Sequence, residues 1–173
     1  MDAELFLKNE ERAVFRLREL YRRHGYLPYK MSKFEEYDLY VRNKSFLVSD
    51  HILTFTDVDG KLMALKPDVT LSILKNCPGG PGLQKVYYHE NVYRTSPASH
   101  GYREIMQAGL ECIGTLDDYA VGEVVMLAAR SLETISGQYL LDLSHLGVVA
   151  GILAAAALTE EERQAALTAM GQK

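Results

Sequence analysis

Residues 103–114 read Arg103-Glu-Ile-Met-Gln-Ala-Gly-Leu-Glu-Cys-Ile-Gly114. Their pattern is typical of a strand, in which successive side chains point to opposite faces of the sheet. One face is then plain core, made of Met106, Ala108, Leu110 and Cys112. The opposite face carries Gln107 and Glu111 on either side of Gly109. An amide and a carboxylate separated by a glycine can form a polar floor under a small ligand, although a solvent-exposed sheet face stays open as the alternative.

A second strand, about Leu83 to Arg94, precedes the first, and the loop Thr95-Ser-Pro-Ala-Ser-His-Gly101 joins the two. This order predicts an antiparallel strand pair. Arg94 stands at the end of its strand beside a hydroxyl-rich loop, where a guanidinium can bind a carboxylate or phosphate through two hydrogen bonds. A lone arginine in such a place is also a common surface ion-pair partner, so the pattern leaves both interpretations open.

Upstream, the sequence predicts a hairpin and then a short helix. Phe46–Thr56 and Lys61–Leu65 are the predicted strands, and Asp59-Gly60 forms the turn between them. Pro67 is expected to open a helix with Val69, Leu71, Ile73 and Leu74 on its apolar face, and Cys77-Pro-Gly-Gly-Pro-Gly82 to end it. Asp68 and Thr70 stand at the start of this helix. They are interpreted as a cap, and the same aspartate can meet a ligand ammonium.

The flanking segments are mostly helical. A first helix is predicted over Asn9–His24 with Gly25 as its cap, and a long helix from Asp117 or Asp118 to Ile135. A strand at Tyr139–Leu143, a helix at His145–Ala157 and a last helix to Met170, opened by Thr159-Glu-Glu-Glu162, complete the order. The expected fold class is α/β, of the α+β kind, with an antiparallel sheet flanked by helices in a single domain spanning residues 1–173.

Composition and charge weigh against several functions. The net charge of −4 and the pI near 5.7 do not favour nucleic-acid binding, because such domains are usually basic. Two cysteines without a C-x-x-C pattern, and five histidines without metal spacing, give no metal site, and no cofactor is expected. The acidic N-terminus is unlike a signal peptide, and no apolar run is long enough to span a membrane, so the expected location is the cytoplasm.

Taken together and in order, several motifs resemble those of the histidyl-tRNA synthetase family, which has a class II synthetase fold. Arg22-Arg-His-Gly-Tyr26 with Lys33-Phe-Glu-Glu36 is similar to the first motif, although Ser32 stands where a proline is usual. Leu65-Lys-Pro-Asp-Val-Thr70 is similar to the L-R-P-E/D-x-T element. Val92-Tyr-Arg94 with Tyr102-Arg-Glu104 is similar to the second motif, and Gln107-Ala-Gly-Leu-Glu111 to Q-x-G-x-E. The resemblance covers nearly the whole chain.

The resemblance implies a histidine pocket lined by Asp68, Thr70, Arg94, Gln107 and Glu111. In that pocket Asp68 would meet the ammonium group and Arg94 the carboxylate, with Gln107 and Glu111 as the floor. The resemblance favours the interpretation in which Gln107 and Glu111 form the floor of a ligand pocket over the one in which they face solvent. Tyr102 and Arg103 would belong to the loop of the second motif.

Two kinds of family member compete. A working synthetase usually has Glu-Arg-Pro shortly after the second-motif arginine and further cationic residues through the loop. Here Thr-Ser-Pro follows the arginine instead. Ala98, Ser99 and Tyr102 stand at positions expected to be polar or cationic. Loss of such groups would weaken contacts to ATP and the acceptor end. The Pro-Asp pair and Leu141-Asp-Leu-Ser-His145 resemble instead the regulatory subunit of ATP phosphoribosyltransferase, which performs no catalysis.

The resemblance therefore implies a regulatory partner of the short-form ATP phosphoribosyltransferase catalytic subunit in histidine biosynthesis and its feedback, with L-histidine as a possible ligand and a homodimer as the expected assembly. No residue is expected to be catalytic. The alternatives are a fragment of a histidyl-tRNA synthetase and a dimerising scaffold without ligand binding. Both kinds of family member carry a second half with a third motif, so the chain is expected to be an incomplete, N-terminal portion of the synthetase-like domain.

Overall fold

The computed structural model describes residues 7–43, 52–77, 82–96 and 101–171. The chain divides into two compact units, Met1–Tyr139 and Leu140–Lys173. The first contains α1 (Asn9–Arg23), α2 (Tyr37–Arg42), α3 (Thr70–Asn76), α4 (Asp118–Ile135) and six strands; the second contains α5 (Leu146–Ala155) and α6 (Glu160–Gly171). The expectation of a single domain over 1–173 stays a prediction.

Within the described residues, the strands of the first unit form two three-stranded sheets. In one, β5 (Gln84–Ser96) pairs with β1 (Leu27–Pro28) in parallel and with β6 (Gly101–Ile113) in antiparallel orientation. In the other, β4 (Leu62–Leu65) lies between β2 (Phe34–Glu36) and β3 (Thr54–Thr56), antiparallel to both. Small sheets flanked by helices confirm the predicted fold class. The short β1, β2 and α2 had no expected counterpart.

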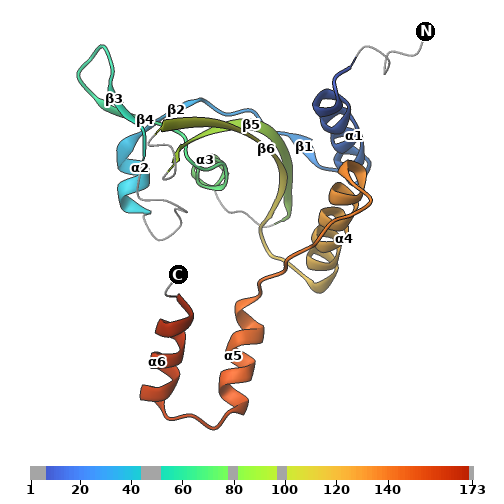
Figure 1. The fold of residues 1–173 in the computed structure, drawn as a ribbon, viewed down its shortest axis with the longest axis vertical. Coiled ribbons are helices and arrows are strands. Elements are labelled where there is room, and N and C mark those ends of the chain that lie inside the picture. Colours follow the sequence, from blue (N-terminus) through green and yellow to red (C-terminus); the bar gives the residue numbers. More distant parts are fainter. Residues whose placement is uncertain (1–6, 44–51, 78–81, 97–100, 172–173) are drawn as a thin grey trace. The chain divides into compact units, whose positions relative to one another are not determined.

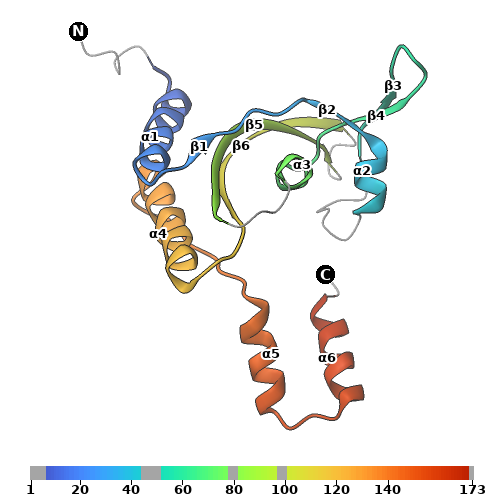
Figure 2. The same ribbon diagram turned by 180° about the vertical axis from the view of Figure 1, so that it is seen from behind.

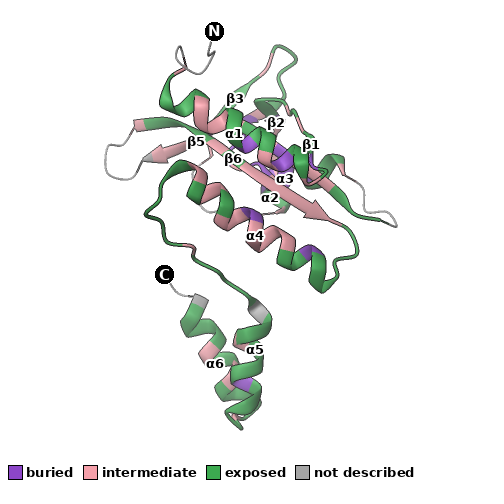
Figure 3. Cartoon of the chain, turned by 90° about the vertical axis from the view of Figure 1, so that its right-hand side faces the viewer, coloured by how far each residue is buried: buried purple, intermediate pink, exposed green. Residues whose placement is uncertain are grey.

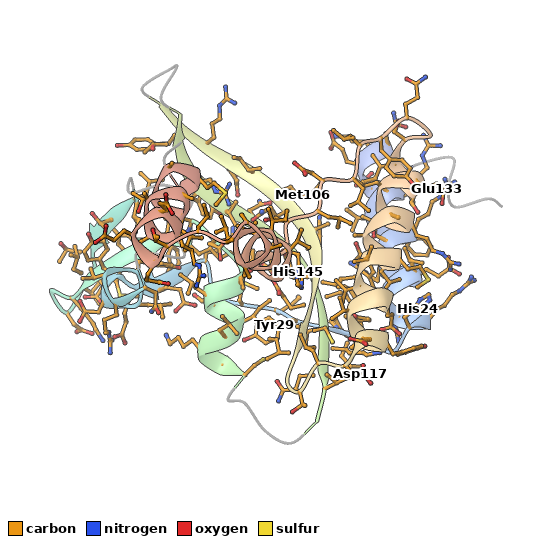
Figure 4. All side chains as sticks on the ribbon, turned by 90° about the horizontal axis from the view of Figure 1, so that it is seen from below. His24, Tyr29, Met106, Asp117, Glu133 and His145 are labelled. Carbon is orange, nitrogen blue, oxygen red and sulfur yellow. The ribbon has the colours of Figure 1, made fainter. Side chains whose placement is uncertain are left out.

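The long β5–β6 ribbon separates two layers of helices. Figures 1 and 2 show α3 inside the curve of the ribbon, and α1 with α4 outside it. Leu17 and Tyr21 of α1 pack with Tyr87 of β5 and Leu127 of α4 in the outer cluster. Figure 3 shows buried, purple positions along both outer helices. The inner cluster joins Val69 and Ile73 to Val92, with Tyr29 beside α3 (Figure 4).

Several local signals produced the expected elements. The helix α1 ends as predicted, with Gly25 at a φ of 80° just beyond it, a conformation that glycine adopts without a steric penalty. The side chain of Asp117, at the start of α4 (Figure 4), accepts a hydrogen bond from the Ala120 amide at 2.8 Å. Thr159 and Glu162 form the predicted capping box at the start of α6.

The hairpin between β3 and β4 turns where the sequence predicted. Asp57 Oδ1 accepts hydrogen bonds from the amides of Asp59 and Lys61, at 2.9 and 2.8 Å. Gly60 has a φ of 80°, as its place in the turn requires. The early part of the predicted Phe46–Thr56 strand lies outside the described residues, as do residues 78–81 and 97–100 of the two predicted glycine- or proline-containing loops.

Some predictions of local structure were wrong. Tyr139–Leu143 is not a strand: this mostly apolar segment has no hydrogen-bonded neighbour within the described residues, and Leu140 and Leu143 are exposed. The helix expected from Pro67 begins only at Thr70, because Asp68 and Val69 form the cap region and Asp68 Oδ1 accepts from the Leu71 amide at 3.2 Å. Leu74, expected on the apolar face of α3, is 40% exposed.

Candidate functional site

The register of β5 and β6 determines which side chains share the face that α3 covers. Val86 lies across from Glu111, Tyr88 across from Gly109, and Glu90 across from Gln107. Val86 and Tyr88 pack in the inner cluster with α3, so their cross-strand neighbours face the same side. Gln107 and Glu111 are half-buried there and do not form an open solvent face. Leu110 and Cys112 pack against the outer cluster, as the alternation predicted, whereas Met106 and Ala108, expected in the core on the same face, are exposed.

A hydrogen bond joins the start of α3 to the floor of this site. Thr70 Oγ1 donates to Glu111 Oε1 at 2.7 Å, across 41 residues of sequence. Burial raises the pKa of the Glu111 carboxyl, the hydrogen bond from Thr70 opposes that shift, and the charge of Asp68 adds to it. Asp68 is therefore close enough to Glu111 to act on its ionisation, and both are half-buried. Two neighbouring acceptors of this kind can hold a cationic donor.

Gly109 leaves the space that Tyr88 occupies. A Cβ at position 109 would lie 2.6 Å from Tyr88 Oη and 2.8 Å from the ring carbon that bears it. The pKa of Tyr88 is raised to about 12, chiefly by burial and then by the charges of Glu111 and Asp68. Tyr88 therefore stays a neutral phenol at neutral pH. Sequence analysis did not assign Tyr88 to the site, because its place follows from the pairing register; Gly109, where bulk is removed, is the only signal in the sequence that points towards it.

Arg94 is attached to the segment that carries Asp68. Its Nε donates to the carbonyl oxygen of Pro67 at 2.9 Å, and its side chain is half-buried. The guanidinium is thus fixed beside the residue that precedes Asp68. This places a cation and an anion at neighbouring points of one site, which is the arrangement that an amino-acid ligand with a carboxylate and an ammonium requires.

The amide of Gln107 lies further along the floor. Its Oε1 is buried and, among the residues that the structure describes, has no hydrogen-bond partner. A buried acceptor without a partner is costly, and a ligand N–H would satisfy it. Across the strand pair, Glu90 Oε2 accepts from Lys66 Nζ at 2.7 Å. Sequence analysis assigned no role to Lys66 or Glu90, because their pairing across 24 residues follows from the fold.

The structure brings together Asp68, Thr70 and Glu111, and it places Arg94 and Gln107 on the same face of the sheet. Tyr102 and Arg103 lie at the beginning of β6, and both are exposed. Arg103 is directly across from Arg94 in the register, and Tyr102 is across from Thr95. The two strands continue to Ser96 and from Gly101, so the predicted loop is shorter than expected, and its centre lies outside the described residues.

Other kinds of site find no support in the described ranges. Over 7–43, 52–77, 82–96 and 101–171, no group of three or more His, Cys, Asp or Glu side chains is arranged to hold a metal ion. Every helix in the described part of the chain is too short or too polar to cross a membrane.

Comparison with known proteins identifies a family for this chain. The sequence model of the family described as Histidyl-tRNA synthetase matches residues 5–173. The histidine–tRNA ligase of Methanocaldococcus jannaschii is 33% identical over 158 residues, covering 85% of this chain and 36% of the relative. That of Methanococcus aeolicus is 32% identical over 137 residues, covering 75% and 32%. The chain thus spans roughly a third of the length of these relatives.

Solved structures agree on the fold. A Bacillus halodurans C structure, described as an ATP phosphoribosyltransferase regulatory subunit/histidyl-tRNA synthetase, has a TM-score of 0.59 and 25% identity, covering 74% of this chain and 34% of that one. An ATP phosphoribosyl transferase complex from Thermotoga maritima has a TM-score of 0.56 at 23% identity, covering 77% and 43%, and supports the fold alone. The small sheets and flanking helices match part of this class II core. The chain belongs to the histidyl-tRNA synthetase family.

Proposed function

We propose that this chain is the N-terminal portion of a non-catalytic regulatory subunit of ATP phosphoribosyltransferase, which binds L-histidine at the site between α3 and the β5–β6 ribbon. It would act in the first step of histidine biosynthesis and in its feedback, as a homodimer in the cytoplasm. The observation that carries the proposal is that Asp68, Thr70, Arg94, Gln107 and Glu111 share one half-buried face. The synthetase-like loop beside them has lost its usual charges.

The polar groups of this face fit the parts of histidine. Asp68 offers a carboxylate to the ammonium group, and Arg94 offers a guanidinium to the carboxylate. The unpartnered Gln107 Oε1 and the Glu111 carboxyl offer acceptors to the two N–H groups of a protonated imidazole ring, and either one suits the single N–H of the neutral ring. Each ligand group would then have a partner of opposite polarity, which binding in a partly desolvated site requires.

The loop between the two strands supports regulation more than catalysis. Catalysis at a phosphate-bearing substrate depends on cations positioned around the developing charge. Thr95-Ser-Pro-Ala-Ser-His-Gly101 contains no lysine or arginine, and Tyr102 follows it. Arg103 is the first cation after the loop and is exposed. A site that keeps amino-acid contacts and lacks this set of cations can bind histidine without activating it.

The second candidate is a portion of a histidyl-tRNA synthetase, which would activate histidine with ATP and charge tRNA. The observation that favours it is the 33% identity to a protein named histidine–tRNA ligase. The two candidates share the histidine pocket and differ in chemistry. A scaffold that dimerises without binding a ligand would neither bind histidine nor activate it.

A co-purification experiment distinguishes the candidates. The full-length gene product is mixed with the short-form ATP phosphoribosyltransferase of the same organism, and the complex is followed by pull-down and gel filtration. The proposal predicts a stable complex and no histidine-dependent ATP–pyrophosphate exchange. Exchange activity without a complex would contradict regulation and support the synthetase candidate.

A further inference from the structure

Lys66 is a lysine with no exposed side-chain surface. Its Nζ donates to Glu90 Oε2 at 2.7 Å, and 17% of the Glu90 side chain is exposed. Lysine is rarely buried completely unless it is paired, because the charge loses its hydration. The pair thus ties the segment after β4 to the middle of β5, on the same face as the proposed histidine pocket.

Two further hydrogen bonds continue this attachment. The Tyr93 amide donates to the carbonyl oxygen of Lys66 at 2.9 Å. Arg94 Nε donates to the carbonyl oxygen of Pro67 at 2.9 Å. Residues 66 and 67 are therefore held against β5 by one side-chain pair and two bonds to backbone oxygens, immediately before Asp68. The separation of Asp68 from Arg94 depends on this attachment.

The pair also borders the floor of the pocket. Glu90 lies directly across the ribbon from Gln107. Without its partner, Glu90 would add an uncompensated carboxylate to a face that already carries Asp68 and Glu111. Lys66 compensates that charge where solvent does not reach it.

From these contacts we infer that Lys66 and Glu90 are positioning residues, which set the placement of Asp68, Arg94 and Gln107 for an amino-acid ligand. The structural role of the pair rests on the three contacts. Its effect on ligand binding rests on the proposed histidine site. The two residues act through their neighbours, and the ligand meets Asp68, Arg94 and Gln107.

The test compares variants of the 173-residue chain by two readouts. Hydrogen exchange of the Tyr93 amide, followed by NMR, reports the attachment of the segment without any ligand. Calorimetric titration with L-histidine reports its consequence for binding. In Lys66→Met and Glu90→Gln, the Tyr93 amide should exchange faster, and histidine should bind about tenfold more weakly or worse. Lys66→Arg keeps the cation and should restore both readouts.

Lys85→Met is the matched control. It breaks another part-buried pair, Lys85 Nζ to Glu123 Oε1 at 2.6 Å, which joins the ribbon to α4 on the opposite face. Tyr93 exchange and histidine affinity should stay at wild-type values in this variant. An equal effect of Lys85→Met and Lys66→Met would overturn the inference, since it would reveal general destabilisation.

A double variant, Lys66→Met/Glu90→Met, covers the case in which the single variants do not fold. Replacing both charges with apolar side chains is often tolerated where removing one is not. Faster Tyr93 exchange and weaker histidine binding are expected, and wild-type values of both would refute the positioning role. If the wild-type chain does not bind histidine, the proposed function fails, whereas the Tyr93 exchange rates still decide whether the pair positions the segment.

Discussion

Protonation of the Glu111 carboxyl contributes to the stability of the fold in a way that depends on pH and can be tested. Burial raises this pKa above the ordinary 4.5, so the folded chain holds the proton more tightly than the unfolded chain. The stabilisation is present below about pH 4.5 and is lost as the pH rises through the folded pKa. Glu111→Gln removes this dependence and keeps an acceptor for Thr70. Thermal unfolding is measured from about pH 4 to pH 7. As the pH rises, the unfolding temperature of the variant should increase relative to that of the wild type. A pH-independent difference would contradict the assignment.

The close approach of Tyr88 to Gly109 predicts a steric cost. In Gly109→Ala, the new Cβ would meet the Tyr88 ring and force it to move, which should destabilise the fold by about 1–3 kcal/mol. Gly122→Ala is the control, because that glycine lies within α4 and its Cβ would meet nothing within 4 Å. It should stabilise by about 0.5–1 kcal/mol. Urea unfolding measures both, and a neutral Gly109→Ala would argue against the packing of Tyr88.

At the level of residues, the sequence predicted part of the candidate site. Alternation along β6 predicted which residues lie with Gln107 and which with Leu110, since that pattern depends only on local strand geometry. Tyr88 and Glu90 were missed because their places follow from the cross-strand register, which no local pattern specifies. Lys66 was missed because its burial depends on a partner 24 residues away.

At the level of elements, the cap of α4 gives the next prediction. Asp117 accepts a hydrogen bond from the Ala120 amide, whereas Asp118 is the exposed first residue of the helix. Asp117→Ala should lower the free energy of unfolding by about 0.5–2 kcal/mol. Asp118→Ala retains the cap and should cost less, since it changes only the interaction with the helix dipole. Equal losses in urea unfolding would show that the cap bond contributes nothing.

Helices were more predictable than short strands. α1, α4 and α6 were expected because their caps and their spacing of apolar residues are local signals. β1 has two residues and β2 has three, so neither has a pattern that could be recognised. Tyr139–Leu143 is a short, mostly apolar run of the kind that can form a strand, but a strand also needs a hydrogen-bonded neighbour, which sequence alone does not provide.

At the level of the whole molecule, family membership rests on residues 5–173, and the chain spans roughly a third of the relatives' length. The order of the motifs predicted this family more reliably than any single motif. The choice between regulation and aminoacylation depends on chemistry at the shared pocket and its loop.

Calorimetric titration of the chain with L-histidine measures whether the face between α3 and the β5–β6 ribbon binds this amino acid. Saturable binding to the wild type is expected, with its loss in the double variant Gln107→Ala/Glu111→Ala, because the two substitutions remove acceptors from the floor. The Lys85→Met variant should bind like the wild type. Absence of binding to the wild type, or undiminished binding to the double variant, would contradict the proposed histidine site.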